Sequence, residues 1–261
     1  MLNLKWYKCP YTKKTYSSIE VFDNLMVIPN QFNYHLNIST KDKINFVLDD
    51  NSFNEKDTAL HTADPLNFIE KTAYKDKIKT YSRKNILSSV RSGSGSINNL
   101  PVQIVFFDFT FLGGSIGSLE GEKVTRCVER SILYKEPLLI FSTSSGARMH
   151  EGVFSLCQLA KTNASLKKLR LSNVPYISIL GNPCMGGAMA SFASIGDFVI
   201  AEPDSLIGFA GPRVIKSTIS TELPEGFQTS KFLLSKGLVD KVVSRKLVKG
   251  AITKILESFY K

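Results

Sequence analysis

The sequence of 261 residues contains no apolar run that approaches the about 18 residues needed to span a bilayer. Its first residues lack the long apolar region and the cleavage site of a secretory signal, and they do not look like a transit peptide. We therefore expect no membrane-spanning segment, and a protein that acts in the compartment where it is made.

Cysteine is scarce and scattered. The cysteines lie far apart, and no two of them form a C-x-x-C pair: Cys9, Cys127, Cys157 and Cys184. This spacing argues against a disulfide framework and against an intact zinc site. Cys127 and Cys157 fall within helical patterns, so we interpret them as small core residues.

Motifs for nucleic-acid binding are also missing. The chain has neither an RNA-binding aromatic motif nor a helix-turn-helix pattern, so we expect no dedicated nucleic-acid module. Its net charge of +10 has two explanations: a composition rich in Lys, Asn, Ile and Phe, as AT-rich genomes encode, or a polyanionic ligand. One stretch groups basic residues with few acids: Lys71, Lys75, Lys77, Lys79, Arg83, Lys84 and Arg91.

What the chain does contain is three glycine turns. They occupy residues 113–121, 144–152 and 183–188; each lies close to an apolar run and precedes a segment with helical spacing. Glycine permits a close backbone approach, and a helix start presents unpaired N–H groups at the positive end of its dipole. Such a strand–turn–helix can hold a phosphate or an oxyanion, and it needs no Ser-His-Asp or Cys-His arrangement beside it.

The pattern along the chain predicts an α/β fold. Strands near 102–109, 137–142, 175–180 and 197–201 alternate with helices near 117–134, 151–171 and 186–195. Units of this length imply mostly parallel strands with right-handed crossovers, and place the glycine turns at their carboxyl ends, where ligands bind. The sequence also predicts a helix from Asp64 to about Arg83, a flexible segment at 92–96, a turn at Asn98-Asn99, and helices near 229–236 and 247–260.

The turns and the residues around them resemble the carboxyltransferase beta-subunit family of the split bacterial and plastid acetyl-CoA carboxylases. The matching segments are 108–118, 121–123, 146–149, 151–152, 186–187, 190–192, 201–203, 207–215 and 223–228. The resemblance implies a crotonase-like fold of repeated ββα units at residues 36–261, preceded by a short remnant of a zinc ribbon at residues 1–35.

The reaction that the resemblance implies moves a carboxyl group from carboxybiotin, attached to a biotin carboxyl carrier protein, to acetyl-CoA. The product is malonyl-CoA, which feeds fatty-acid synthesis. The methyl carbon of acetyl-CoA must lose a proton, and fixed backbone N–H groups stabilise the resulting enolate oxygen. The biotin ureido nitrogen, uncovered when carbon dioxide is released, can act as the base, so no side-chain base is required.

Among the turns, the resemblance assigns the oxyanion hole to the N–H groups of Gly186 and Gly187. Gly146 and Ala147 are expected to line the thioester side of the site. These four are the catalytic residues that the sequence predicts.

Binding of coenzyme A is expected to involve the first turn and two arginines. The turn shapes the channel through three glycines: Gly113, Gly114 and Gly117. Arg148 and Arg213 either contact phosphates or brace the loops. The basic residues between Lys71 and Arg91 attract the phosphates by long-range charge.

Simpler roles stay open for several of these residues. Gly113-Gly114 can serve helix–strand packing alone, and Arg148 can belong to a buried ion pair with Glu151. His150 lies beside the second turn, but it is not favoured as a base, because the mechanism needs none.

Two further candidates near the turns are not favoured as functional. Cys184 has no partnering histidine in the pattern, so we do not favour it as a nucleophile. Glu122 and Lys123 are interpreted as a solvated helix face.

The chain departs from the family in three places. The two C-x-x-C pairs of the ribbon are reduced to one cysteine, so we predict no metal; the four positions hold Cys9, Thr12, Pro29 and Phe32. Ser145 stands where the family has glycine, and serine cannot take a positive φ cheaply. Cys184-Met185 replaces two threonines but leaves the glycines after it intact.

One set of turns supplies only half of a carboxyltransferase site, so the resemblance implies an alpha subunit for the other half, in an α2β2 assembly. No segment resembles a biotin-attachment motif or an ATP-grasp domain, which makes the carrier protein and biotin carboxylase separate partners. Two other interpretations stay open: another crotonase-fold enzyme, such as a hydratase or a serine peptidase, and a non-catalytic binding protein. Composition and the lost ribbon ligands indicate the cytosol of a bacterium or the stroma of a plastid, with a reduced AT-rich genome.

Overall fold

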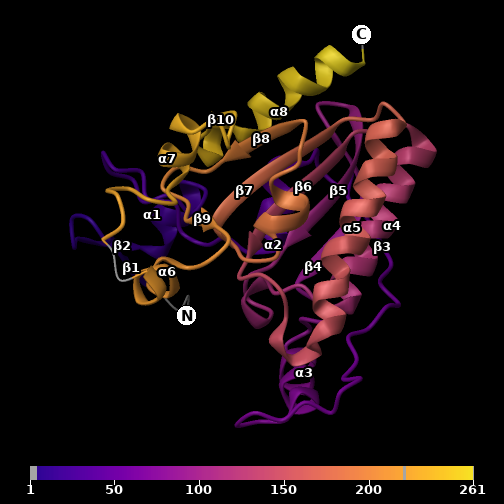
Figure 1. Cartoon of the computed structure of the whole chain (residues 1–261). Coiled ribbons are helices and arrows are strands. Elements are labelled where there is room, and N and C mark those ends of the chain that lie inside the picture. The colour runs from indigo at the N-terminus through magenta and orange to yellow at the C-terminus, as the bar shows by residue number, and fades with distance from the viewer. Residues whose placement is uncertain (1–4, 220–221, 261) are drawn as a thin grey trace.

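The computed structural model describes residues 5–219 and 222–260, and a twisted mixed sheet forms its centre (Figure 1). The strands follow the order β10-β8-β7-β6-β5-β4-β3, and β9 pairs with the end of β7. Their bounds are β3 (Asn54–Lys56), β4 (Val90–Ile97), β5 (Leu100–Phe107), β6 (Leu138–Ser144), β7 (Tyr176–Met185), β8 (Phe198–Ala201), β9 (Ile207–Gly208) and β10 (Lys241–Val242). Strands β5 to β8 and β10 are parallel, while β3, β4 and β5 pair antiparallel.

Helices cover both faces of the sheet. In Figure 1, α4 (Ser118–Tyr134) and α5 (Val153–Leu171) lie side by side on one face, and α8 (Arg245–Phe259) lies on the other. Helix α2 (Thr40–Val47) packs against α8 and β5. The remaining helices are α1 (Ser18–Asp23), α3 (Tyr74–Ser82), α6 (Pro212–Ile219) and α7 (Ser230–Ser235), with short helical turns at 112–114, 149–151 and 189–193.

Burial on both faces explains the continuous apolar strands that the sequence shows. In β6, Leu138 and Ile140 belong to the core under α4 and α5, whereas Leu139 and Phe141 belong to the core under α2 and α8. Successive side chains of a strand point to opposite faces, so a strand between two helical layers is apolar throughout. The predicted α/β layering with parallel strands is thereby confirmed.

Three predicted elements differ from the structure. The segment at 92–96 is not flexible: it lies in β4, held by backbone pairing to β3 on one side and β5 on the other, and closed by the predicted turn at Asn98-Asn99. The helix expected from Asp64 is limited to α3, which begins only at Tyr74. The helix expected at 186–195 is an irregular π-helical turn, broken at Ser191 by φ −125° and ψ −108°.

The N-terminal piece consists of a hairpin of β1 (Trp6–Lys8) and β2 (Thr15–Ser17), followed by α1. It is tied to the start of α8, because Arg245 N–H donates to His35 Nε2 at 3.1 Å and Arg245 Nη1 donates to Leu25 O at 2.9 Å. The proposed division at residue 35 stays a prediction. Within the described ranges, no helix is both long and apolar enough to cross a membrane.

Candidate functional site

The three glycine turns meet at one edge of the sheet, because they follow the parallel neighbours β5, β6 and β7. Ser145 N–H donates to Gly113 O at 2.9 Å, which joins the second turn to the first. Gly146 touches the third turn, since a Cβ added there would lie 3.0 Å from the nitrogen of Gly187. The structure thus brings the predicted residues of all three turns together.

Of the four predicted catalytic residues, two have backbone N–H groups that already have acceptors. Gly186 N–H donates to the carbonyls of Gly208 and Phe209, at 2.9 and 3.0 Å. Gly146 N–H donates to Ser144 Oγ at 3.1 Å. The prediction that Gly186 offers its N–H to an oxyanion is therefore corrected: the pairing of β9 with β7, which sequence reasoning missed, occupies that donor.

The other two N–H groups are unpartnered and adjacent. Among the residues that the structure describes, neither Ala147 N–H nor Gly187 N–H has a hydrogen-bond acceptor. The two lie against each other, because a Cβ on Gly187 would be 3.3 Å from the nitrogen of Ala147. Two fixed amide donors that lie side by side are an arrangement that can bind an oxyanion.

Arg148, next to this pair, is buried completely. Its guanidinium lies 2.9 Å from Glu120 Oε1 and 3.0 Å from Glu151 Oε1, and it donates to Ser115 O at 2.7 Å. Tyr74 OH accepts from Arg148 and donates to Glu151. The side chain has no exposed surface with which to reach a phosphate. Of the two predicted roles, Arg148 therefore has that of bracing the loops, and the predicted contact with a phosphate is wrong.

The two carboxylates of this network hold the first turn. Glu120 accepts the Gly117 N–H at 2.9 Å, and Glu151 accepts the Ser118 N–H at 2.6 Å. Burial raises the pKa of Glu120, but Arg148 and the backbone N–H groups of Ser89 and Gly117 outweigh burial and hold that pKa below the usual value. Gly117 leaves no room for a side chain, because a Cβ would overlap Glu151 and lie 2.6 Å from Arg148 Nη1.

The glycines of the first turn serve the packing role that the sequence analysis left open. Gly113 and Gly114 have φ values of 67° and 66°, which favour glycine. A Cβ on Gly114 would overlap the carbonyl oxygen of Thr143, so this residue permits the first turn to pack on β6. Whether the turn shapes a coenzyme A channel stays a prediction.

The substitution at Ser145 leaves the second turn unstrained. Ser145 does not take a positive φ; the left-handed position is Gly146, at φ 110°. Arg213 is the second residue of α6, and its side chain lies outside the described part of the chain. Its predicted contact with a phosphate stays a prediction.

His150 and Cys184 do not have the environment of reactive groups. His150 stacks on Tyr74 with ring centroids 4.8 Å apart, and its Nε2 lies 3.1 Å from Lys77 Nζ. Burial, followed by the charge of Lys77, lowers the pKa of His150, so its neutral ring accepts from the lysine. Cys184 is fully buried, and burial raises the pKa of its thiol to about 12.

The helix face of Glu122 and Lys123 is solvated only in part. Glu122 pairs with Arg126 and Lys161 near the surface. Lys123, in contrast, is buried, and its Nζ donates to Val90 O at 3.2 Å. The prediction that Lys123 is solvated is wrong, because helix α4 directs this side chain toward Val90, the first residue of β4.

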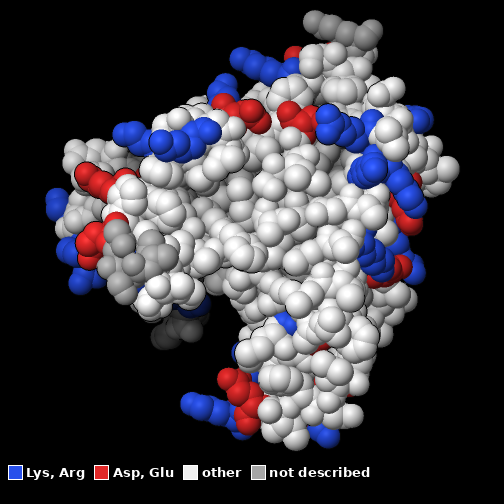
Figure 2. Space-filling model, viewed as in Figure 1, with Lys and Arg blue, Asp and Glu red and all other residues white. Residues whose placement is uncertain are grey.

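Several of the basic residues between 71 and 91 are paired with acids. Arg91 lies 2.6 Å from Glu55, and Lys77 lies 3.3 Å from Glu70. Figure 2 shows charged side chains along the rim of one face, whose hollowed centre carries few. Long-range attraction of phosphates by this group stays a prediction.

Sequence reasoning missed Tyr74 and Glu120. For Glu120 a partial signal exists: it lies three residues after Gly117, the N-cap of α4, and accepts the Gly117 N–H, which is one half of a capping box. Tyr74 gives no such signal, because 74 residues separate it from Arg148 in the chain.

Parallel strands with glycine turns at their carboxyl ends, covered by helices on both faces, define a crotonase-like α/β protein. The model of the carboxyl transferase domain family matches residues 41–245. Among curated proteins, the acetyl-coenzyme A carboxylase carboxyl transferase subunit beta of Opitutus terrae is 45% identical over 256 residues, covering 96% of this chain and 88% of that protein. The same subunit of Wolinella succinogenes is 46% identical, covering 97% and 88%.

Solved structures agree with this class. The crystal structure of transcarboxylase 12S with methylmalonyl-coenzyme A bound has a TM-score of 0.69 and 29% identity, over 85% of this chain and 41% of that one. A Pseudomonas malonate decarboxylase hetero-dimer, at 19% identity and a TM-score of 0.64 over 85% and 86% of the chains, shares the fold. The chain belongs to the family of acetyl-CoA carboxylase carboxyltransferase beta subunits, and it is a carboxyltransferase.

Proposed function

We propose that Ala147 N–H and Gly187 N–H together bind the thioester oxygen of acetyl-CoA during carboxyl transfer to give malonyl-CoA. The observation that supports this is the pair of adjacent amide donors without acceptors among the described residues. When the methyl carbon loses its proton, negative charge moves to the thioester oxygen. Donors already fixed by β6 and β7 stabilise that charge without reorganising.

Biotin, carried as carboxybiotin on a partner protein, supplies the carboxyl group and a basic nitrogen. This chain's own residues fit a reaction in which biotin, and not a side chain of this subunit, supplies the base. Near the paired donors, His150 Nε2 faces Lys77 and Cys184 is buried with a raised pKa, so neither is placed to take the methyl proton. The chain therefore orients the thioester and stabilises charge, and Gly113, Gly114 and Gly117 shape the approach of coenzyme A.

The second half of the site comes from an alpha subunit, in an α2β2 assembly that a biotin carboxyl carrier protein and biotin carboxylase serve. Beside the second turn, exposed apolar side chains cluster at the start of α5: Met149, Val153, Phe154 and Leu156. Together with the weakly charged centre of the face in Figure 2, they are suited to burial against another subunit. The relatives named above are bacterial, which supports the bacterial cytosol or a plastid stroma as the location.

Decarboxylation of malonyl-CoA, the reverse half-reaction, tests this function. The chain is co-purified with its alpha subunit and assayed with free biotin. We expect turnover that requires biotin and both subunits. A stable complex without turnover would contradict catalysis by this chain and favour a binding protein with salt-dependent affinity for RNA.

We further propose that the N-terminal piece folds without zinc. Cys9 is buried, and its Sγ accepts from Thr12 N–H at 3.5 Å and from Asn30 Nδ2 at 3.3 Å. Burial raises the pKa of this thiol, but these hydrogen bonds outweigh burial and lower it to about 7. Within the described ranges, no cluster of three or more metal-ligating side chains occurs.

Chelation distinguishes an N-terminal piece that folds without zinc from one that depends on zinc. Treatment with a strong chelator should leave the melting temperature and the decarboxylation rate unchanged, and metal analysis should find less than one zinc per chain. The carboxyltransferase with an intact four-cysteine ribbon is the matched control, because it should lose zinc and stability under the same treatment. Stoichiometric zinc that disappears on chelation would overturn the proposal.

A further inference from the structure

Lys43 of helix α2 is a buried lysine on the α2 side of the sheet. It lies in a layer of apolar residues, is only 8% exposed, and its ammonium makes no ion pair among the described residues. Burial lowers the pKa of Lys43 to about 8. The charge of Arg245 also lowers this pKa, whereas the charges of Glu202 and Asp108 raise it. At pH 7 the charged form still predominates and offers three N–H donors.

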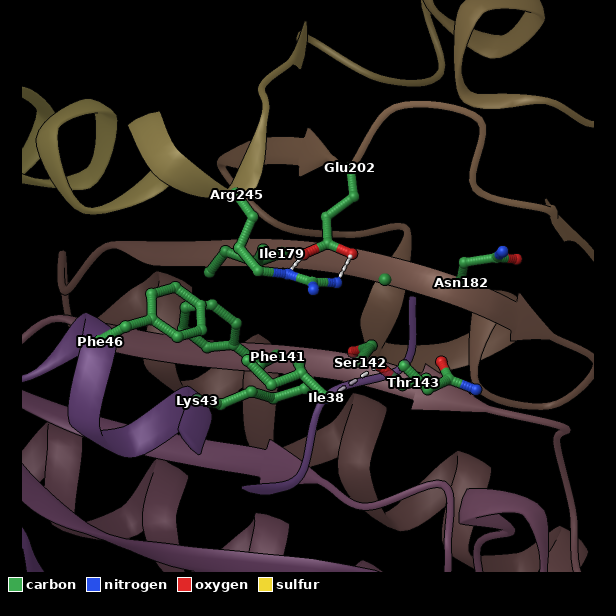
Figure 3. Close-up of a pocket in the computed structure, with 12 residues that line it drawn as sticks. Ile38, Lys43, Phe46, Phe141, Ser142, Thr143, Ile179, Asn182, Glu202 and Arg245 are labelled. Carbon is green, nitrogen blue, oxygen red and sulfur yellow. Dashed lines mark hydrogen bonds and ion pairs between the residues drawn. The ribbon is translucent and has the colours of Figure 1, made fainter. Parts of the chain in front are cut away.

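Two of those donors connect the ends of two strands. Lys43 Nζ donates to Phe107 O and to Thr143 Oγ1, each at 3.1 Å. Figure 3 shows Lys43 beside Thr143. Phe107 is the last residue of β5, and the β5–β6 pairing has already ended at Phe106 and Phe141. The lysine therefore joins the two strands just beyond the point where backbone hydrogen bonds stop.

Thr143 is also where the register between β6 and β7 changes. Ser142 pairs with Leu180 and Ser144 with Cys184, so three residues of β7 lie opposite Thr143 alone. Irregular pairing of this kind bends a strand and leaves residues outside the backbone ladder, so a side-chain contact can fix their position. Lys43 supplies such a contact from helix α2.

The second glycine turn begins one residue after Thr143. Ser144 Oγ accepts the Gly146 N–H, and Ala147 follows directly. The carbonyl of Thr143 also touches Gly114 of the first turn. A shift of Thr143 is thus transmitted to both turns and to the donor of Ala147.

The space beside Lys43 is nearly filled. A cavity of about 20 Å³ lies between Lys43, Ser142, Asn182 and the Glu202–Arg245 pair, whose two hydrogen bonds are 2.7 and 2.8 Å long. It has room for about one water molecule. Ser142 Oγ lines it, fully buried and without a partner in the described chain.

We propose that Lys43 is a positioning residue of the carboxyltransferase site: it fixes the ends of β5 and β6 so that Ala147 N–H converges with Gly187 N–H. The inference depends on the oxyanion role proposed above. Lys43 contacts no substrate; it acts through Thr143 and Phe107.

The test compares four variants in the complex with the alpha subunit. Lys43→Met and Thr143→Val remove the donor and its acceptor at similar size, and Thr143→Ser retains the hydroxyl. Lys123→Met is the matched control, because Lys123 is another buried lysine bonded to a backbone carbonyl, but its acceptor is Val90 O at the start of β4 and not an atom at the ends of β5 and β6. The readouts are kcat and KM for malonyl-CoA per assembled complex, and hydrogen exchange of the amides at residues 144–148.

We expect Lys43→Met to lower kcat by about 10²-fold with KM little changed, since small misplacements of catalytic groups have effects of this size. Thr143→Val should lower kcat in the same way, and Thr143→Ser should restore it. Exchange at 144–148 should accelerate at least tenfold in Lys43→Met but not in Lys123→Met.

Unchanged kcat and unchanged exchange in Lys43→Met would overturn the inference. So would a loss in Lys123→Met equal to that in Lys43→Met, which would indicate general destabilisation. If the wild-type complex has no turnover, the proposed function fails, and the exchange measurement alone decides whether Lys43 fixes the turn.

Discussion

Replacing Gly187 by alanine should lower kcat by about 10²–10³-fold, equivalent to about 2.7–4 kcal/mol of lost transition-state stabilisation. The added methyl group would lie 3.3 Å from the nitrogen of Ala147, and in the proposed binding mode it would compete with the thioester oxygen for the space beside that donor. Its other neighbour, at 2.9 Å, is the flexible end of Leu159, which can move aside, so we expect the variant to fold. The measurement is steady-state malonyl-CoA decarboxylation by the assembled complex.

Gly250→Ala is the matched control for this substitution. Gly250 lies in α8, and a Cβ added there meets nothing within 4 Å. Alanine is favoured over glycine in a helix, so activity should be unchanged and stability equal or slightly higher. If Gly187→Ala retains the wild-type kcat, the thioester oxygen does not bind between these two donors.

Replacing Arg148 by methionine should cost about 3–5 kcal/mol of the free energy of unfolding, because it leaves two buried carboxylates without their cation. The side chain of Glu120 has no exposed surface and that of Glu151 has almost none. The two carboxylates would therefore face each other in a site closed to solvent. The first turn, which both carboxylates hold through backbone N–H groups, would lose its anchor. Denaturant unfolding of the isolated chain measures the effect.

The loss should depend on pH. In the wild-type protein the folded-state pKa of Glu120 lies below its ordinary value of about 4.3, so the stability it contributes is present above that pH and lost as the pH falls further. In the variant the buried carboxylates favour protonation, so the difference from wild type should be largest at neutral pH and should narrow on acidification.

Arg126→Met provides the comparison for Arg148. Arg126 also contacts two carboxylates, Glu122 at 2.7 Å and Asp57 at 3.2 Å, but it is 44% exposed. Exposed pairs contribute about 0.2–1 kcal/mol, so this variant should be nearly as stable as wild type. Equal losses in the two variants would contradict a special role for the buried network.

The layering of the fold could be predicted because it depends on local patterns. Apolar runs such as Leu138–Phe141, buried on both faces, and helical spacing between them are visible in the sequence. The strand β4 could not be predicted this way, because its Ser-Gly composition indicates flexibility and its order comes from pairing with β3 and β5. Long-range backbone pairing has no local signature.

The site shows the same limit. Glycine turns identify where candidate donors lie, but only the pairing of β9 reveals that Gly186 N–H is occupied. This is why we propose Ala147 N–H as the donor beside Gly187. Likewise, the alternative that Arg148 pairs with Glu151 was visible from their spacing, while Tyr74 and Lys43 reach the site from more than 70 residues away. Neither residue stands out by type or motif.

Both amide donors belong to a single polypeptide, and this has a consequence for the order of events. The sheet holds them whether or not a second subunit is present, so the free beta subunit should already recognise a thioester ligand. Ligand binding to the folded state raises its stability by mass action, and the melting temperature of the lone subunit should rise with the concentration of malonyl-CoA. Substrate capture and subunit association are then separate steps, and substrate can arrive first.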